Sequence, residues 1–213
     1  MKNSVQDGET GSRMTQAERT ALSDSKMFAA AVSLINERGT QKTTLKEIGE
    51  RAGYSRGLAN YRFGSKDRLM LELFESFDKL WKAHLSEYIG AATGLHAVLQ
   101  AADALRDFLK KESSYMRAMY LLWYECLGHE SDMLGTLSLH HDVYRQDAQH
   151  WIEQGIAAGE INPAINPEQF SVQYCAFIFG IVYQWLVNAS ALDLDAVFDS
   201  YKLNTTTLLK HSE

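Results

Sequence analysis

The sequence predicts an all-α fold, an expectation that rests on three observations. Leu (25) and Ala (23) far outnumber Val (8) and Ile (9), and the first pair favours helices while β-branched residues favour strands. The only prolines are Pro163 and Pro167. With 213 residues, 46% of them apolar, the chain can bury a sizeable core in at most two domains. We therefore expect a globular helical protein with no β-sheet.

The N-terminal part predicts a tail followed by a helix. Residues 1–18 are rich in Ser, Thr, Gln and Gly, and we expect them to form a flexible tail. From Arg19, apolar residues recur at helical spacing as far as Glu37 and Arg38, and Gly39 supplies a helix stop. These apolar residues are Ala21, Phe28, Val32 and Ile35.

Two short helices follow. Thr44 and Glu47 have the spacing of a capping box, in which the Thr hydroxyl accepts from the Glu N–H while the Glu carboxylate accepts from the Thr N–H. This helix ends at Gly53. Ser55 is then a suitable N-cap for a third helix, which runs to about Arg62.

A fourth, longer helix is predicted after Ser65, long enough to join two units. Its apolar stripe consists of Leu69, Leu73, Phe77, Leu80, Trp81, His84 and Tyr88. Five more helices are expected, at 94–111, 114–127, about 138–158, 167–189 and 193 to about 209. Asn166 and Pro167 form a strong helix start, because Asn caps the helix and Pro is favoured at its first position.

The charge is unevenly distributed along the chain. Residues 1–70 hold 12 Lys/Arg and 8 Asp/Glu, whereas the remainder holds 9 and 19. A basic front part on an acidic body suggests that only the front part meets a polyanion. Cys126 and Cys175 form no C-x-x-C pair, and the N-terminus has no apolar leader. These features favour a cytoplasmic location.

An uncharged stretch runs from Gln169 to Leu192 and is long enough to cross a bilayer. It also contains several polar residues and no flanking Lys/Arg clusters, which argues against a membrane partner. We instead expect a helix buried on nearly all sides, partly by another subunit. Gly180 at its centre would allow close approach of a partner helix.

The segment from Thr44 to Phe63 has the outline of a helix-turn-helix, in which the second helix enters the major groove of DNA. Between Arg38 and Arg68 there are eight cations and three acids. Without further evidence, these cations could equally be a solvated face of an all-helical interaction module that binds no DNA.

The motif resembles the TetR family of bacterial transcriptional regulators. The resemblance runs from Thr43 to Gly57, through T-T-L-K-E-I-G-E-R-A-G-Y-S-R-G, and continues from Phe63 to Leu69, through F-G-S-K-D-R-L. The family pattern is T-T-x-x-x-I-A-x-x-A-G-x-S-x-G followed by F-x-x-K-x-x-L. About 50 residues carry the specific resemblance, and the helical body agrees only in kind.

The resemblance implies a DNA-binding domain over residues 19–65 and an effector-binding and dimerisation domain over residues 66–213. It implies a homodimer, joined through the helices at about 138–158 and 167–189, that binds a palindromic operator in double-stranded DNA. The residues it assigns to DNA binding are Thr43, Thr44, Ser55, Arg56, Gly57, Leu58, Asn60, Tyr61, Arg62 and Lys66.

Within that set, Thr43, Tyr61 and Lys66 match phosphate contacts, and residues 56–58 and 60 match the groove-facing start of the recognition helix. The family usually has Leu then Tyr where this chain has Ala59 and Asn60. The aromatic ring here is one residue later, which turns it by about 100°. Asn60 can pair with adenine through two hydrogen bonds. Gly49 replaces the usual Ala and is expected to loosen its helix.

The resemblance also implies that a small apolar or aromatic effector binds the body and releases a repressor from DNA. Aromatic and Met residues, the latter adaptable in shape, are concentrated on the body helices. The candidate ligand-binding residues are Trp81, His84, Tyr88, Met116, Met119, Tyr120, Trp123, Tyr174, Phe177 and Tyr183. For each of them, ordinary core packing is the alternative.

Two further patterns are weaker. Residues 53–57 match G-x-S-x-G, the nucleophile elbow of serine hydrolases, but that elbow requires a preceding strand, and the preceding sequence is helical and charged. Ser55 is better explained as a helix cap, so we expect no enzymatic activity and no cofactor.

A metal site would need ligands from separate helices that converge in the fold. The candidate ligands are Glu125, Cys126 and His129, with His140 and His141, and we expect no metal site.

Overall fold

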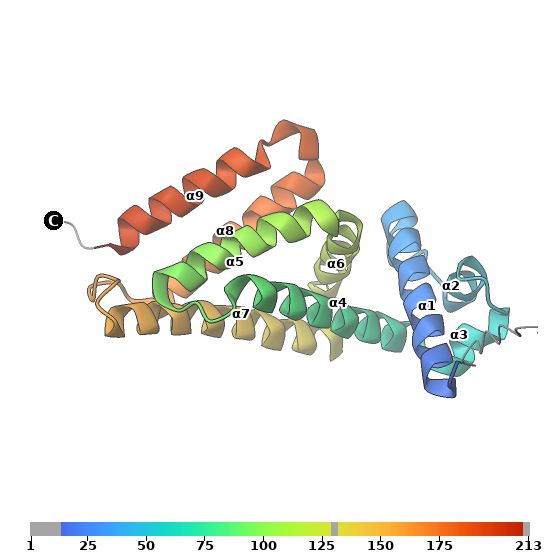
Figure 1. The fold of residues 1–213 in the computed structure, drawn as a ribbon. Helices are drawn as coiled ribbons and strands as arrows, with labels where there is room; N and C mark the ends of the chain where they lie inside the picture. Colours follow the sequence, from blue (N-terminus) through green and yellow to red (C-terminus); the bar gives the residue numbers. More distant parts are fainter. Residues whose placement is uncertain (1–13, 129–131, 211–213) are drawn as a thin grey trace, which may run out of the picture.

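The computed structural model describes residues 14–128 and 132–210, and over these residues it confirms the all-α fold, with no strand. Figure 1 shows a head formed by the first three helices and a larger helical body. The helices are α1 (Gln16–Arg38), α2 (Leu45–Arg51), α3 (Arg56–Phe63), α4 (Lys66–Ile89), α5 (Gly94–Lys111), α6 (Ser113–Cys126), α7 (Asp132–Ala157), α8 (Pro167–Val187), the short 3₁₀ helix η1 (Ala189–Ala191) and α9 (Leu194–Leu209).

The first helix starts earlier than the sequence predicts. Thr15 caps α1: its hydroxyl accepts from the Glu18 N–H at 3.2 Å, and the Glu18 carboxylate accepts from the Thr15 N–H at 2.7 Å. The expectation of a tail through residue 18 is therefore wrong for its last residues, which begin a capped helix. Residues 1–13 lie outside the described part of the chain.

The helices α2 and α3 cross closely at Gly49. A Cβ on Gly49 would lie 3.3 Å from the Ser55 carbonyl oxygen and 3.5 Å from the Ala59 Cβ. Gly53, with φ +81°, makes the turn between the two helices. The glycine at position 49 thus permits the tight crossing instead of merely loosening α2, which is what we expected from helix propensity.

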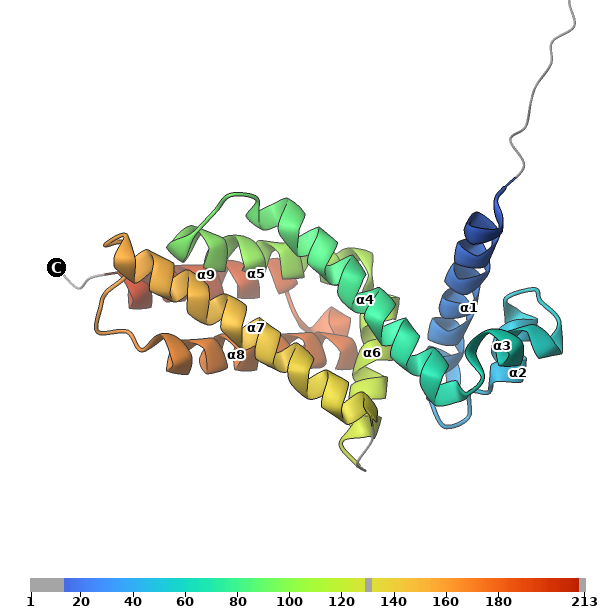
Figure 2. The ribbon, with the colours of Figure 1, turned by 90° about the horizontal axis from the view of Figure 1, so that it is seen from below.

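The long helix α4 joins the head to the body, as predicted, and Figure 2 shows it continuing from beside α3 across the body. Ser65 caps it by accepting from the Arg68 N–H at 3.1 Å. The apolar stripe is buried at Leu69, Leu73, Phe77 and Trp81. Leu80 was predicted in this stripe, but it is 39% exposed.

Close packing of α5 on α7 depends on two glycines. A Cβ on Gly94 would lie 3.0 Å from the Gly155 Cα, and a Cβ on Gly155 would overlap the buried Ile161 side chain. Gly94 has φ +58°, a conformation that side chains other than glycine rarely adopt. The two backbones therefore touch where α5 begins.

The helix α8 is long and apolar enough to cross a bilayer, yet in the single chain only a third of its most apolar window is buried. It packs on α7 along one face. The expectation that it is buried on nearly all sides is therefore not met within one chain, since Val172, Tyr183 and Val187 are exposed.

Candidate nucleic-acid interface and internal cavity

The helix-turn-helix presents an exposed edge along α3. Tyr61 is 89% exposed, and Ser55, Gly57 and Asn60 are exposed beside it on the same helix or at its start. The buried side of α3 is formed by Ala59 and Phe63, which join the core of the head. Packing of two short helices through Ile48 and Ala59 thus leaves the other side of α3 free for solvent or a partner.

Gly57 occupies a position that the protein itself leaves open. It lies inside α3, and a Cβ there would meet no atom within 4 Å. Helical glycine is less stable than alanine by about 1 kcal/mol. Neither backbone conformation nor crowding in the chain accounts for this glycine, whereas close approach of α3 to a macromolecule would.

Three residues predicted to contact DNA are placed differently. Thr43 is fully buried, and its hydroxyl donates to the Gly39 carbonyl at 2.9 Å. Leu58 is half-buried and packs against the core of the head. Arg62 donates to Asp24 at 2.7 Å and to Glu72 at 3.0 Å. These contacts explain the three residues without DNA, and their DNA contacts stay predictions that this geometry disfavours.

The caps of α2 and α3 also differ from expectation. The Thr44 hydroxyl accepts from the Glu47 N–H at 3.4 Å, as predicted, but it also donates to the Glu47 carboxylate at 2.6 Å. Ser55 occupies the N-cap position of α3, yet its hydroxyl makes no capping hydrogen bond. The exposed Ser55 hydroxyl is therefore available to another partner. The side chain of Arg56 lies outside the described part of the structure.

The charges of the head are largely organised by arginine pairs. Arg51 binds the Glu37 carboxylate through two hydrogen bonds, at 2.6 and 2.9 Å, which together with Ser33 lower the pKa of Glu37 to about 2. The Thr44 hydroxyl and Arg38 likewise lower the pKa of Glu47. These acids are therefore ionised and neutralised internally.

The lysines of the head are differently placed. Lys42 and Lys46 are exposed, and neither forms an ion pair with a residue that the structure describes. Lys66, at the first position of α4, donates to the Thr40 carbonyl at 3.3 Å and is only half-buried. These three ammonium groups therefore place positive charge on the surface of the head that no described carboxylate pairs with directly. Our site prediction named Lys66 but missed the other two, although the cation count contained them.

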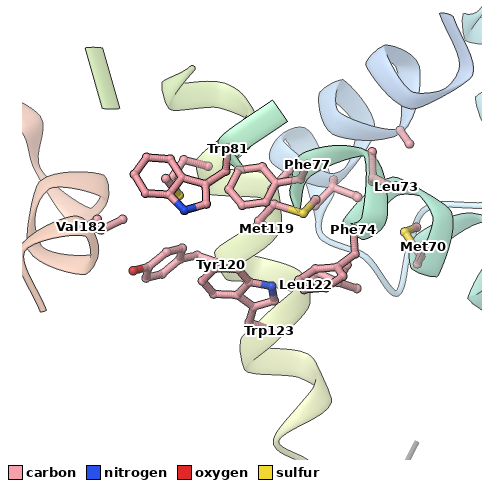
Figure 3. Close-up of a cluster of buried hydrophobic side chains, with 14 of the residues drawn as sticks. Met70, Leu73, Phe74, Phe77, Trp81, Met119, Tyr120, Leu122, Trp123 and Val182 are labelled. Atoms are coloured by element: carbon pink, nitrogen blue, oxygen red, sulfur yellow. The ribbon is translucent and has the colours of Figure 1, made fainter. Parts of the chain in front are cut away.

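A small apolar cavity of about 50 Å³ lies between α4, α5, α6, α7 and α8 in the body. Figure 3 shows one side of it, where Trp81 of α4 lies opposite Tyr120 and Trp123 of α6, with Val182 of α8 nearby. The lining residues are Phe77, Trp81, Leu85, Ala101, Leu105, Met116, Tyr120, Trp123, Tyr144, Trp151, Tyr174, Cys175, Ile178, Phe179 and Val182. None of them is charged.

The structure brings five of the ten candidate ligand residues to this cavity, namely Trp81, Met116, Tyr120, Trp123 and Tyr174. Met119 is fully buried but does not line the cavity, and Tyr183 is 48% exposed. Phe177 stacks on Tyr201 of α9 with ring centroids 3.7 Å apart. His84 and Tyr88 lie beside α5, where His84 contacts the Ala104 carbonyl at 3.0 Å. Sequence reasoning missed the aromatic lining residues Phe77, Tyr144, Trp151 and Phe179.

Two histidines lie near the cavity, of which His140 is buried and His141 is half-buried. The His140 Nδ1 atom is 2.9 Å from an Asp78 oxygen, and burial nevertheless lowers the pKa of His140 to about 4. His141 stacks on Phe179 with ring centroids 4.6 Å apart. No group of three possible metal ligands gathers among the described residues. His129, part of the weaker metal pattern, lies outside them.

The fold thus places a helix-turn-helix, with an exposed edge along α3, in the head of the molecule. Residues 28–73 match the model of the bacterial regulatory proteins of the tetR family. The N-terminal part of the chain is therefore similar to the DNA-binding domain of the TetR family, which confirms the resemblance seen in the sequence.

The relatives agree with this assignment. The HTH-type transcriptional regulator CymR of Pseudomonas putida is 36% identical over 63 residues, which are 30% of this chain and 31% of CymR. The chain thus matches less than a third of that curated relative.

Solved structures are similar over nearly the whole chain. NalD of Pseudomonas aeruginosa, a repressor of the MexAB-OprM multidrug efflux pump, has a TM-score of 0.71 at 19% identity and covers 92% of this chain and 99% of its own. FadR of Bacillus subtilis, solved with stearoyl-CoA, has a TM-score of 0.74 at 18% identity, covering 87% and 98%. At these identities the likeness concerns the fold.

Proposed function

We propose that this protein is a ligand-responsive transcriptional repressor that binds a palindromic operator as a homodimer and leaves it when a small apolar or aromatic effector binds the body. The observation that carries the proposal is the exposed edge of α3, where Gly57, Asn60 and Tyr61 stand free of the core. The nearby lysines supply positive charge for the phosphate backbone. Its site of action would be the cytoplasm, and no catalytic step is involved.

The homodimer would place two recognition helices in successive major grooves, about 34–36 Å apart. Exposed large apolar residues support an interface on α8 and α9: Val172, Tyr183 and Val187 lie on the first helix and Leu203 and Leu208 on the second. On α7, predicted to share the interface, Leu139 is the exposed large apolar residue among those described. We therefore propose α8 with α9 as the main contact.

Effector binding would act on DNA binding through α4. This helix lines the cavity with Phe77 and Trp81 and begins at Lys66 in the head. The head also contacts the body directly, because α1 packs on α6 and the Asn36 side chain donates to the Ser114 carbonyl at 2.8 Å. An effector that enlarges the cavity would favour a second conformation in which the two heads of the dimer are spaced differently. The shift in the equilibrium between the two conformations is limited by the difference in the effector's affinity for them.

The test is enrichment of random duplex DNA on the purified full-length protein. We expect a palindrome whose half-sites lie one helical turn apart. Asn60→Ala should relax the preference at one base pair at a cost of about 1–3 kcal/mol. Lack of enrichment would favour the alternative of an interaction module that binds no DNA.

The hydrolase alternative has no support from the fold. Ser55 follows the helix α2, and the described residues contain no strand on which a nucleophile elbow could be built. Ester turnover that disappears in Ser55→Ala would nevertheless revive that alternative.

A further inference from the structure

A hydrogen-bond donor is left without a partner in the wall of the cavity. The indole N–H of Trp81 is buried and bonds to no group in the described part of the chain, and the residue is only 8% exposed. In Figure 3 this nitrogen lies on the edge of the ring that faces Tyr120. Buried N–H groups are usually paired, so an unpaired donor beside an internal space points to an acceptor that comes from outside the chain.

The second unpaired indole nearby is oriented differently. The Trp123 N–H is also buried without a partner, but its nitrogen lies toward Phe74 in Figure 3. The Tyr120 hydroxyl already donates to the Phe179 carbonyl at 3.3 Å. Of the two unpaired indoles, Trp81 is therefore the one that a molecule in the cavity would meet.

The rest of the wall restricts the charge and shape of such a molecule. Of the 15 lining residues, 8 are aromatic and none carries a charge. An ion in this cavity would lose its hydration without gaining a counter-charge, which is strongly unfavourable. The neighbouring His140 has its pKa lowered to about 4 by burial, so it supplies no positive charge near neutral pH. Flat aromatic walls favour ring-shaped ligands through edge and stacking contacts.

The volume limits the size of the ligand. The cavity measures about 50 Å³, whereas an apolar cavity that binds benzene measures about 150 Å³. Even a single ring must therefore push the walls apart, and larger molecules would need far greater rearrangement.

We propose that the cavity binds an uncharged single-ring molecule carrying one hydrogen-bond acceptor, which receives the Trp81 N–H. This inference rests on the proposed ligand-responsive function and specifies the chemical class of its effector. It excludes carboxylates and other anions as ligands of this cavity.

Three probes of nearly equal shape test the proposal by titration calorimetry on the full-length protein. Acetophenone has a ring and one carbonyl acceptor, α-methylstyrene replaces that carbonyl with a CH₂ group, and benzoate is the anionic analogue. We expect acetophenone to bind about two- to tenfold more tightly than α-methylstyrene, which is what one net hydrogen bond contributes. Benzoate should not bind.

Two variants locate the hydrogen bond. Trp81→Phe should remove the preference for acetophenone and leave binding of α-methylstyrene in place, which also shows that the variant is folded. Trp151→Phe removes another indole that lines the cavity and should keep the preference. A preference that survives in Trp81→Phe would overturn the proposal, as would tight binding of benzoate or no binding of acetophenone at millimolar concentration.

The DNA experiment separates this inference from the proposed function. Enrichment of a palindrome together with no response to these probes would contradict the effector class alone. Selective binding of acetophenone by a protein that enriches no DNA would contradict the regulator alone.

Discussion

The Arg62 guanidinium lies 2.7 Å from the Asp24 carboxylate and thereby fastens α3 to α1. Its second carboxylate partner, Glu72, is 3.0 Å away on α4. Arg62 was expected to contact DNA, but its ion pairs hold α3 to α1 and to the beginning of α4.

We expect Arg62→Met to lower the free energy of unfolding by about 1–2 kcal/mol, because it leaves the partly buried Asp24 carboxylate without its partner and leaves Glu72 with Arg68 alone. The logarithmic salt dependence of DNA binding should keep its slope, since no phosphate contact is lost. Urea denaturation and a salt titration measure the two quantities. Arg68→Met is the matched control: this exposed arginine contacts the same Glu72, so stability should change by less than about 0.5 kcal/mol.

Lys66→Met should weaken binding to all duplex sequences and reduce the salt slope by about 0.9, the value for one phosphate contact. Tyr61→Phe should weaken binding without changing that slope, because a phenol carries no charge. Lys79→Met, an exposed lysine on the body part of α4, serves as the control. An unchanged slope for Lys66→Met would remove Lys66 from the interface.

Gly155→Ala should destabilise the protein by about 1–3 kcal/mol, because the added methyl group collides with the buried Ile161 and nears the Gly94 Cα at 3.2 Å. Chemical denaturation gives the value. In Gly135→Ala, on the same helix but with open space around the new Cβ, stability should stay the same or rise by up to about 1 kcal/mol. Equal effects of the two substitutions would show that the crossing of α5 and α7 is not tight.

Stability should fall when the pH drops below about 6.5 toward 4, and His140 should account for part of the loss. Burial holds the pKa of His140 near 4 in the folded protein, against the opposing pull of Asp78, whereas the unfolded chain binds a proton near pH 6.5. In this window the unfolded state holds more protons, so stability rises with pH. His140→Asn, which keeps an N–H donor for Asp78, should reduce the fall by roughly 1–3 kcal/mol. Urea midpoints across this range test it, and parallel curves would contradict it.

Gly180→Glu should convert the proposed homodimer to monomers in sedimentation equilibrium. A Cβ at this position has open space around it in the single chain, so the substitution is tolerated by the fold and acts on the partner. Gly135→Glu introduces the same charge at an open glycine of α7 and should remain dimeric. A dimer in both variants would place the interface away from the centre of α8.

Capping signals determined how well the helix boundaries could be predicted. Asn166, whose side chain accepts from the Gln169 N–H at 2.9 Å, set the start of α8 correctly. The same T-x-x-E signal at Thr15 was present but overlooked. The start of α7 was placed six residues late, because Gly135 interrupts the apolar pattern there. Burial of Leu137 shows that tertiary packing outweighs this local preference.

The position of α3 could be predicted from the sequence, whereas the lining of the cavity could be predicted only in part. The family motif fixes the position of the recognition helix, and Tyr61 is exposed as its place in α3 requires. The cavity depends on which face of each body helix turns inward, and sequence periodicity did not decide this on α8, because apolar residues lie on every side of that helix. Tyr183 was therefore predicted to line the ligand site but is exposed to solvent, whereas Phe179 was not predicted there and lines the cavity.

Because α4 is one continuous helix, a small tilt of it displaces its amino end by a distance that can be calculated from its length. Trp81 lies 15 residues after Lys66 on this helix, which corresponds to about 22 Å of rise. A tilt of about 5° pivoting near the tryptophan would carry the lysine end sideways by roughly 2 Å. The same tilt moves Phe77, which lines the cavity four residues from the pivot, by only about 0.5 Å, so the displacement at the amino end is roughly fourfold larger.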